Sequence, residues 1–206
     1  MMELLDYFDG KRLLDKHGIK SVESRYVSSA QDAVAFAAAS PIVLKLISGK
    51  ALHKSKAGLV KLDLKGPDIS KAYSELVSKG RLLKPYRIIA QKMAKNGVEI
   101  IIGGRTDEQF GKLILIGLGG IYVNIFKDFA LRVCPIKQED AQEMIDQLKS
   151  RDIVTFGGKN RKILVKLLMD VNSLLVENRS ISELDLNPVV ARADGYVAVD
   201  IRMLMQ

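Results

Sequence analysis

The sequence has one cysteine, Cys134, two histidines and no tryptophan among its 206 residues. A single cysteine excludes an intrachain disulfide and a cysteine-based zinc site, and two histidines exclude a histidine-rich metal site. The longest apolar run, Leu113 to Val123, contains three glycines and is far shorter than the roughly 20 residues that span a bilayer. The first ten residues carry acidic groups and no basic one, unlike a signal peptide. We therefore expect a cytoplasmic protein without a membrane partner.

Apolar residues make up 48% of the chain and charged residues 27%, which allows a sizeable core and argues against intrinsic disorder. Periodicity predicts helices and strands mixed without a strict βαβ alternation, so the expected class is α+β with antiparallel pieces. The predicted helices are 4–16, 30–39, 68–78, 139–149 and 161–177. The predicted strands are 42–48, 60–64, 87–91, 98–103, 112–116, 121–126, 184–192 and 196–201. The Asn96-Gly97 dipeptide favours a hairpin between strands 87–91 and 98–103.

The net charge of +8 is concentrated in two stretches. Residues 41–66 hold six lysines and one acid, and residues 79–95 hold six basic residues and no acid. In both stretches the charges alternate with apolar residues, which is typical of folded strands and loops with one charged face. Such a face suits phosphate-bearing partners, although an ordinary solvated basic surface explains the charge equally well.

The common nucleotide and nucleophile motifs are missing: there is no Walker A sequence, no Gly-x-Gly-x-x-Gly after a strand and no Gly-x-Ser-x-Gly. Lys45 nevertheless lies inside an apolar strand, where a charge is costly to bury without an anion. A small, polar connection with the loop 53–58 follows, and its backbone N–H groups can hold phosphate. The alternative is an exposed hairpin with Lys45 on its hydrated face.

A second cluster joins Asp185, Asn187 and Pro188 to Asp200, thirteen residues after Asn187. If the two last strands form a hairpin, Asn187 and Asp200 approach each other and supply oxygen ligands that suit Mg²⁺. The alternative is a turn at Asn-Pro with a surface aspartate.

Gln91 and Glu99 bracket the connection at 95–97, and residues 117–120 form a glycine turn that lets backbone approach a ligand or another subunit. Plain hairpin polar residues and a tight turn are the simpler explanations. Together, the clusters predict two lobes that clamp a nucleotide, with phosphates at Lys45, the base near Gln91 and magnesium at 187 and 200.

Several segments, in order along nearly the whole chain, carry a family resemblance. They are 41–48, 52–62, 97–107, 109–111, 117–123, 127–128, 132–135, 183–188 and 199–200. With them the chain resembles the β subunit of ADP-forming acyl-CoA (acetyl-CoA) synthetases, which is related to the succinyl-CoA synthetase β subunit. The resemblance implies an ATP-grasp fold with two α/β lobes. We expect residues 1–18 to form a helix packed on the C-terminal lobe, residues 19–85 the N-terminal lobe and residues 86–206 the C-terminal lobe.

The resemblance also implies roles for single residues. The implied nucleotide-binding residues are Lys45, His53, Lys54, Ser55, Gln91 and Glu99, with Lys45 on phosphate and Gln91 beside adenine. Asn187 and Asp200 match magnesium ligands, and Asp185 matches an acidic position near a travelling phosphohistidine. His53 matches a histidine proposed to carry phosphate transiently, and a plain phosphate-binding role for it stays open.

The family reaction is acyl-CoA + ADP + phosphate ⇌ acid + CoA + ATP, with ATP/ADP and Mg²⁺ as cofactors. It implies a separate CoA-binding α subunit that carries the primary phosphohistidine, in an α2β2 hetero-oligomer. Leu59 stands where the family usually has glycine, and Asn124 where it usually has glutamate. These departures motivate an alternative, a non-catalytic or regulatory ATP-grasp module. A nucleic-acid binder is disfavoured, since no aromatic residues accompany the lysines as stacking platforms.

Overall fold

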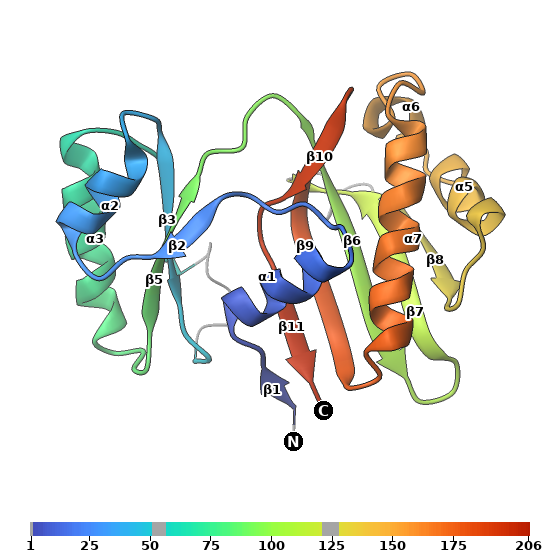
Figure 1. The fold of residues 1–206 in the computed structure, drawn as a ribbon, viewed down its shortest axis with the longest axis horizontal. Coiled ribbons are helices and arrows are strands. Elements are labelled where there is room, and N and C mark those ends of the chain that lie inside the picture. The colour runs from blue at the N-terminus through green and yellow to red at the C-terminus, as the bar shows by residue number, and fades with distance from the viewer. Residues whose placement is uncertain (1, 51–56, 121–127) are drawn as a thin grey trace. The chain divides into compact units, whose positions relative to one another are not determined.

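The computed structural model describes residues 2–50, 57–120 and 128–206 (Figure 1). The chain divides into two compact units, one made of Met1–Ser21 with Lys95–Gln206 and the other of Val22–Ala94. The sequence led us to expect a boundary after residue 85, whereas the units divide after residue 94. The physical reason is that the strand Arg87–Lys92 (β5) lies between two strands of the smaller unit's sheet.

The smaller unit is an antiparallel sheet packed against two helices. Its strand order is β2 (Ser24–Tyr26), β5, β3 (Ile42–Ile47) and β4 (Val60–Leu64), and its helices are α2 (Ala30–Ala37) and α3 (Pro67–Gly80). Ile42, Leu44 and Leu46 belong to one core with side chains from both helices, including Phe36 and Leu76. Apolar residues at alternate positions of β3 therefore face the helices and fix the register of the strand.

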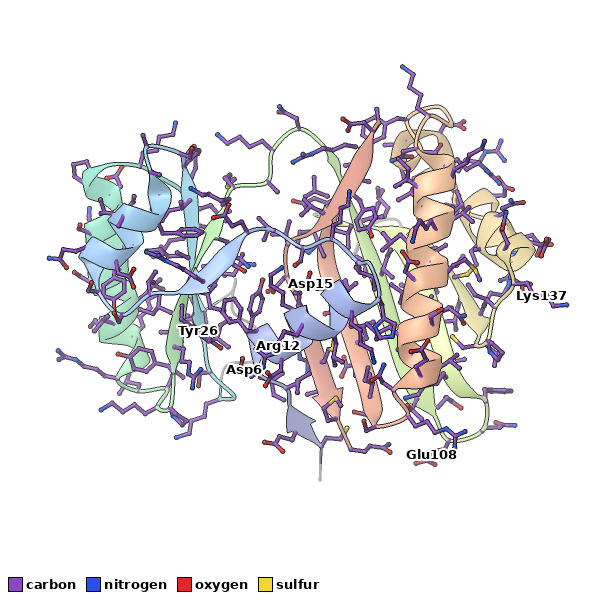
Figure 2. All side chains as sticks on the ribbon, viewed as in Figure 1. Asp6, Arg12, Asp15, Tyr26, Glu108 and Lys137 are labelled. Atoms are coloured by element: carbon purple, nitrogen blue, oxygen red, sulfur yellow. The ribbon has the colours of Figure 1, made fainter. Side chains whose placement is uncertain are left out.

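The larger unit has the strand order β1 (Glu3–Leu4), β11 (Arg202–Met205), β9 (Ile181–Arg192), β6 (Val98–Asp107), β7 (Gly111–Leu118) and β8 (Phe129–Val133), and β10 (Gly195–Ala198) pairs with β9. Its helices are α1 (Tyr7–Lys16), α5 (Gln138–Asp146), α6 (Arg151–Val154) and α7 (Arg161–Glu177). Asp6 caps α1 by accepting the Phe8 N–H at 2.9 Å (Figure 2). None of the described helices is long and apolar enough to cross a membrane.

One face of the larger sheet is buried beneath helices. Ile100, Ile102, Ile114 and Ile116 are fully buried at alternate positions of β6 and β7, and α7 crosses these strands in Figure 1. Gly104 lies on the same face, where an added Cβ would come within 2.5 Å of the Leu175 side chain on α7. The missing side chain thus lets the helix approach the sheet closely.

The hairpin expected at Asn96-Gly97 is wrong. Asn96 has the positive φ of 59° that this dipeptide favours, but β5 and β6 belong to different sheets. Both edges of β5 are already occupied, by β2 and β3, so no edge is left for β6, which pairs instead with β7 and β9. The Asn-Gly pair therefore lies in the passage from one unit to the other.

Other elements differ in their bounds. Helix α2 stops at Ala37, two residues early, because Ala38 and Ala39 adopt left-handed φ values of 44° and 64° ahead of Pro41. The strand predicted at 196–201 is β10, which ends at Ala198, and a further strand, β11, follows it. β2 and β8 were not predicted, and the strand predicted at 121–126 lies outside the described residues.

Candidate functional site

Lys45 and Gln91 lie on the same face of the smaller sheet. Lys45 pairs with Ile89 and Gln91 pairs with Val43, so the two polar side chains project from neighbouring strands, one alternate position apart. This face is opposite to the one that Ile42, Leu44 and Leu46 turn to the helices. Lys45 is 4% exposed and Gln91 is fully buried. A cation and an amide buried on one sheet face suit a ligand with an anionic part and a polar part.

The phosphate-loop residues His53, Lys54 and Ser55 lie outside the described residues. The described chain resumes at Ala57, and the carbonyls of Ala57 and Gly58 accept hydrogen bonds of 3.0 and 3.2 Å from the Lys79 side chain on α3. Leu59 is 1% exposed in the core of the smaller unit. The departure from glycine at position 59 therefore adds a core side chain at the start of β4.

Asn187 and Asp200 lie where the pairing of β9 passes from β10 to β11. Val189 pairs with Ala198 on one side and Asp185 pairs with Arg202 on the other. Between them, the Val199 N–H donates to the Pro188 carbonyl at 2.9 Å. The register is the same on both sides of this gap, so residue 200 falls opposite residue 187.

This pair fits magnesium by its chemistry. An amide oxygen and a carboxylate are oxygen donors, and Mg²⁺ usually takes one or two carboxylates while it keeps waters and phosphate oxygens. Within residues 2–50, 57–120 and 128–206, no three His, Cys, Asp or Glu side chains gather into a metal-binding group. A site here would therefore depend on ligand phosphates to complete the coordination.

Asp185 shares the face of Asn187, two residues along β9. Opposite it on β6 is Gly103, which has no side chain, so space is left over the carboxylate. Opposite it on β11 is Arg202, whose guanidinium donates to Glu183 at 3.3 Å. Arg202 was not predicted as a site residue, because the sequence did not indicate the strand β11 that carries it.

Glu99 lies exposed on β6 in the larger unit, whereas Gln91 belongs to the smaller one, so the turn expected to link them does not exist. The glycine turn at 117–120 contacts Glu99. The Gly119 N–H donates to the Glu99 carbonyl at 2.7 Å, and a Cβ on Gly120 would lie 2.8 Å from the Glu99 carboxylate. Gly120 also has a φ of +69°, so side chains are excluded here by backbone conformation and by space.

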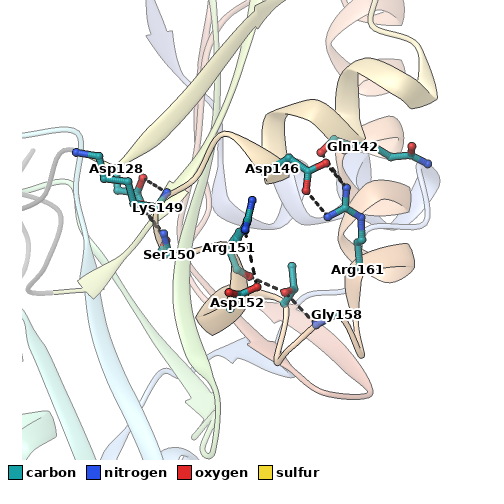
Figure 3. Close-up of polar contacts among 10 residues, drawn as sticks. Asp128, Gln142, Asp146, Lys149, Ser150, Arg151, Asp152, Gly158 and Arg161 are labelled. Atoms are coloured by element: carbon teal, nitrogen blue, oxygen red, sulfur yellow. Dashed lines mark hydrogen bonds and ion pairs between the residues drawn. The ribbon is translucent and has the colours of Figure 1, made fainter.

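Asp128 is held by hydrogen bonds from the connection between α5 and α6 (Figure 3). Its carboxylate accepts hydrogen bonds from the Lys149 N–H and Ser150 N–H, both 2.9 Å, and from the Ser150 hydroxyl. Burial by itself raises the pKa of Asp128, but these hydrogen bonds outweigh burial and hold the pKa below its usual value. Its carbonyl accepts the Leu118 N–H at 3.0 Å. The residue thus ties the end of β7 to the connection between α5 and α6.

Residues 2–205 match the family model described as an ATP-grasp domain. The chain is 35% identical over 208 residues to the β subunit of acetate–CoA ligase [ADP-forming] I of Pyrococcus furiosus, covering 96% of this chain and 90% of that subunit. It is 36% identical to acetate–CoA ligase [ADP-forming] I of Archaeoglobus fulgidus, over 96% of this chain but only 30% of that longer protein.

Among solved structures, the dinucleotide-forming acetyl-coenzyme A synthetase 1 of Ca. Korarchaeum cryptofilum, in complex with coenzyme A and Ca-AMPCP, superimposes with a TM-score of 0.89. The identity is 34%, and the match covers 100% of this chain and 93% of that one. A complex of the same protein with Mg-AMPPCP, its phosphohistidine segment pointing towards the nucleotide binding site, gives a TM-score of 0.82 at 33% identity and covers 98% and 93%. The expected α+β ATP-grasp fold and the resemblance are confirmed, and the chain belongs to the ATP-grasp family that contains the β subunits of ADP-forming acetate–CoA ligases.

Proposed function

We propose that this chain is the nucleotide-binding subunit of an ADP-forming acid–CoA ligase. It transfers a phosphoryl group between a phosphohistidine and ADP: the N–P bond to the imidazole breaks, and a P–O bond to the terminal ADP oxygen forms. The net reaction is acyl-CoA + ADP + phosphate ⇌ acid + CoA + ATP. The observation that carries the proposal is the common register of β10 and β11 on β9, which puts residue 200 opposite Asn187 and close to Asp185, in a chain of this family.

Each residue has a role in this proposal. Lys45 binds phosphate as a buried point charge, and its shared sheet face with Gln91 supports a base contact at Gln91. Asn187 and Asp200 hold Mg²⁺, which neutralises phosphate charge when it is bound. Asp185 accepts a hydrogen bond from the phosphohistidine ring and orients it.

The remaining assignments rest on the resemblance alone. His53, Lys54 and Ser55 belong to the loop over the phosphates, and Glu99 is a second nucleotide contact. His53 is either a phosphate donor group or a transient phosphate carrier, and mass spectrometry of the chain after reaction with a phosphorylated partner separates the two roles.

The proposal includes a partner. A CoA-binding α subunit carries the primary phosphohistidine and joins this chain in an α2β2 hetero-oligomer of the cytoplasm. Support comes from the subunit name of the Pyrococcus relative, whose length this chain nearly matches, and from the Archaeoglobus relative, of which this chain spans 30%. The acid that is activated is set by the partner.

Calorimetric titration with MgADP and MgATP tests the nucleotide site. Lys45→Ala is compared with Lys61→Ala, a lysine of the adjoining strand β4 that pairs with Glu75. Loss of a charge-assisted phosphate contact should weaken binding about 10-fold or more in the first variant only. Asp200→Asn is compared with Asp194→Asn, in the turn of the same hairpin. If Lys45→Ala and Asp200→Asn both bind like the wild type, the site assignment is wrong.

The second candidate is the non-catalytic or regulatory module. It predicts the same nucleotide binding but no transfer of ³²P between the α subunit and ADP. A wild-type complex that binds nucleotide and exchanges no phosphate would establish this alternative. Leu59 gives it no support, because the side chain lies in the core of the smaller unit.

A further inference from the structure

We propose that the helix-free face of the larger sheet, meaning the face that none of the described helices covers, is the docking surface for the CoA-binding partner subunit. The partner would place an apolar segment along β7 and β8 and bring the imidazole ring of its phosphohistidine to Asp185. This inference rests on the proposed function, and its test is kept separate from nucleotide binding.

An apolar strip runs along the edge strand of this sheet. Phe129, Leu131 and Val133 alternate on β8 and are 56%, 43% and 48% exposed. Their ladder partners on β7 are Gly117, Leu115 and Leu113, so one face carries apolar side chains from two adjoining strands. The residues between them point to the opposite face, where Ala130 is buried.

A groove of about 910 Å³ lies beside this strip. Its lining includes Phe129, Leu131, Leu115, Gly103, Arg105 and Asp185. Every residue that lines it belongs to the larger unit, so the groove exists within one compact body. It is hollow partly because Gly103, the ladder partner of both Asp185 and Leu115, has no side chain.

Such a strip is unusual on a surface that stays in water. Single exposed apolar residues are common, but contiguous apolar patches mark interaction sites. Edge strands are normally protected by charge, whereas the helix-free face of β8 carries Phe129, Leu131 and Val133. The strip therefore favours a covering partner.

The groove indicates which partner covers it. Its apolar part leads to Asp185, two residues before Asn187 on β9. The charged end of the groove holds Arg105 together with the carboxylates of Glu108, Glu183 and Asp185. The Arg105 side chain is 65% exposed. Apolar side chains at one end and the Asp185 carboxylate at the other suit a segment that carries a phosphohistidine, because a carboxylate accepts a hydrogen bond from the imidazole ring.

A second copy of this chain fits less well. An isologous contact through β8 would cover Phe129 and Leu131 but bring no phosphoryl group to the charged end. The relatives point the same way, because in the Archaeoglobus protein 70% of the polypeptide lies outside the matched region and has to pack somewhere (100% less the matched 30%).

The test measures association of the full-length chain with the CoA-binding subunit encoded in the same genome, by sedimentation velocity and biolayer interferometry. Leu131→Glu puts a charge in the strip and should weaken association about 10-fold or more, since it would be desolvated in the complex. Ile153→Glu is the matched control, a 59% exposed apolar residue of the same unit outside the groove. Calorimetric MgADP binding should stay unchanged in both variants.

A second variant separates loss of docking from a folding defect caused by the added charge. Gly103→Val fills the groove without charge, and its Cβ would meet only the Leu184 carbonyl, at 3.4 Å, so the strand tolerates it. It should also weaken association, and hydrogen exchange of residues 129–133 should slow in the wild-type complex. Association equal to the wild type in both groove variants would overturn the proposal. A wild-type chain that binds no CoA-binding subunit would also overturn it. The same holds if the groove variants lose only the association of the chain with itself. Loss of MgADP binding in the wild type would instead count against the proposed function.

Discussion

Replacing Asp128 by alanine tests how a buried carboxylate holds the larger unit together. Asp128 is 9% exposed, and its three hydrogen-bond donors come from Lys149 and Ser150. Alanine removes the acceptor and leaves two backbone N–H groups without it, one buried and one partly buried. Each buried donor left unsatisfied costs about 1–3 kcal/mol, and the partly buried one costs less because water reaches it. We expect a loss of about 2–4 kcal/mol in the free energy of unfolding.

Urea unfolding followed by circular dichroism measures this loss. Ser150→Ala removes one hydroxyl donor and should cost about 1 kcal/mol. Asp152→Ala is the control, because Asp152 follows Ser150 closely in the sequence and its side chain is 82% exposed. This variant should change the free energy of unfolding by less than about 0.5 kcal/mol.

The pH dependence gives an independent check. The folded pKa of Asp128 lies below the unfolded value of about 3.9. A lowered pKa stabilises the fold above the unfolded value, and this contribution disappears as pH falls through the folded value. The stability difference between wild type and Asp128→Asn should therefore be full at pH 7 and shrink below about pH 4. If the difference in unfolding free energy between wild type and Asp128→Asn stays constant down to pH 3, the reasoning is refuted. It is also refuted if Asp128→Ala unfolds at the same urea concentration as the wild type.

Three further outcomes follow from local geometry. Gly119→Ala should lose about 1–3 kcal/mol in urea unfolding, because its Cβ would lie 2.8 Å from the backbone of Glu99; an unchanged midpoint would contradict the close approach. Burial raises the pKa of the Cys134 thiol to about 11. Its alkylation by iodoacetamide at pH 8 should therefore be at least about 10-fold slower than that of free cysteine, and equal rates would argue against burial. Arg161→Ala removes an exposed ion pair with Asp146 and should cost less than about 1 kcal/mol in the same unfolding assay, so a larger loss would point to a packing role.

Long periodic elements were predictable from the sequence, and pairings that depend on distant strands were not. The helix Arg161–Glu177 was predicted with its observed bounds, because its apolar positions repeat at the helical period over 17 residues. The Asn96-Gly97 hairpin failed, because a local turn preference cannot overcome the lack of a free edge on β5.

The candidate site, too, was predictable from the sequence only in part. The terminal hairpin that carries Asn187 was predicted from its Asp194-Gly195 turn, and the structure has it as β9 and β10. Arg202 was missed because β11 follows an interruption of the ladder, and only tertiary structure shows that the register resumes.

The order of strands in the larger sheet also bears on how the chain folds during synthesis. Among the described strands β1 pairs only with β11, so the N-terminal strand lacks this neighbour until residues near 205 have been made. The smaller unit is continuous from Val22 to Ala94 and is complete before half of the chain exists. On the ribosome this unit can fold early, whereas the first 21 residues cannot complete their strand pairing until the last strand has been synthesised. C-terminal truncation should therefore expose nascent N-terminal segments to proteolysis and leave the smaller unit protected.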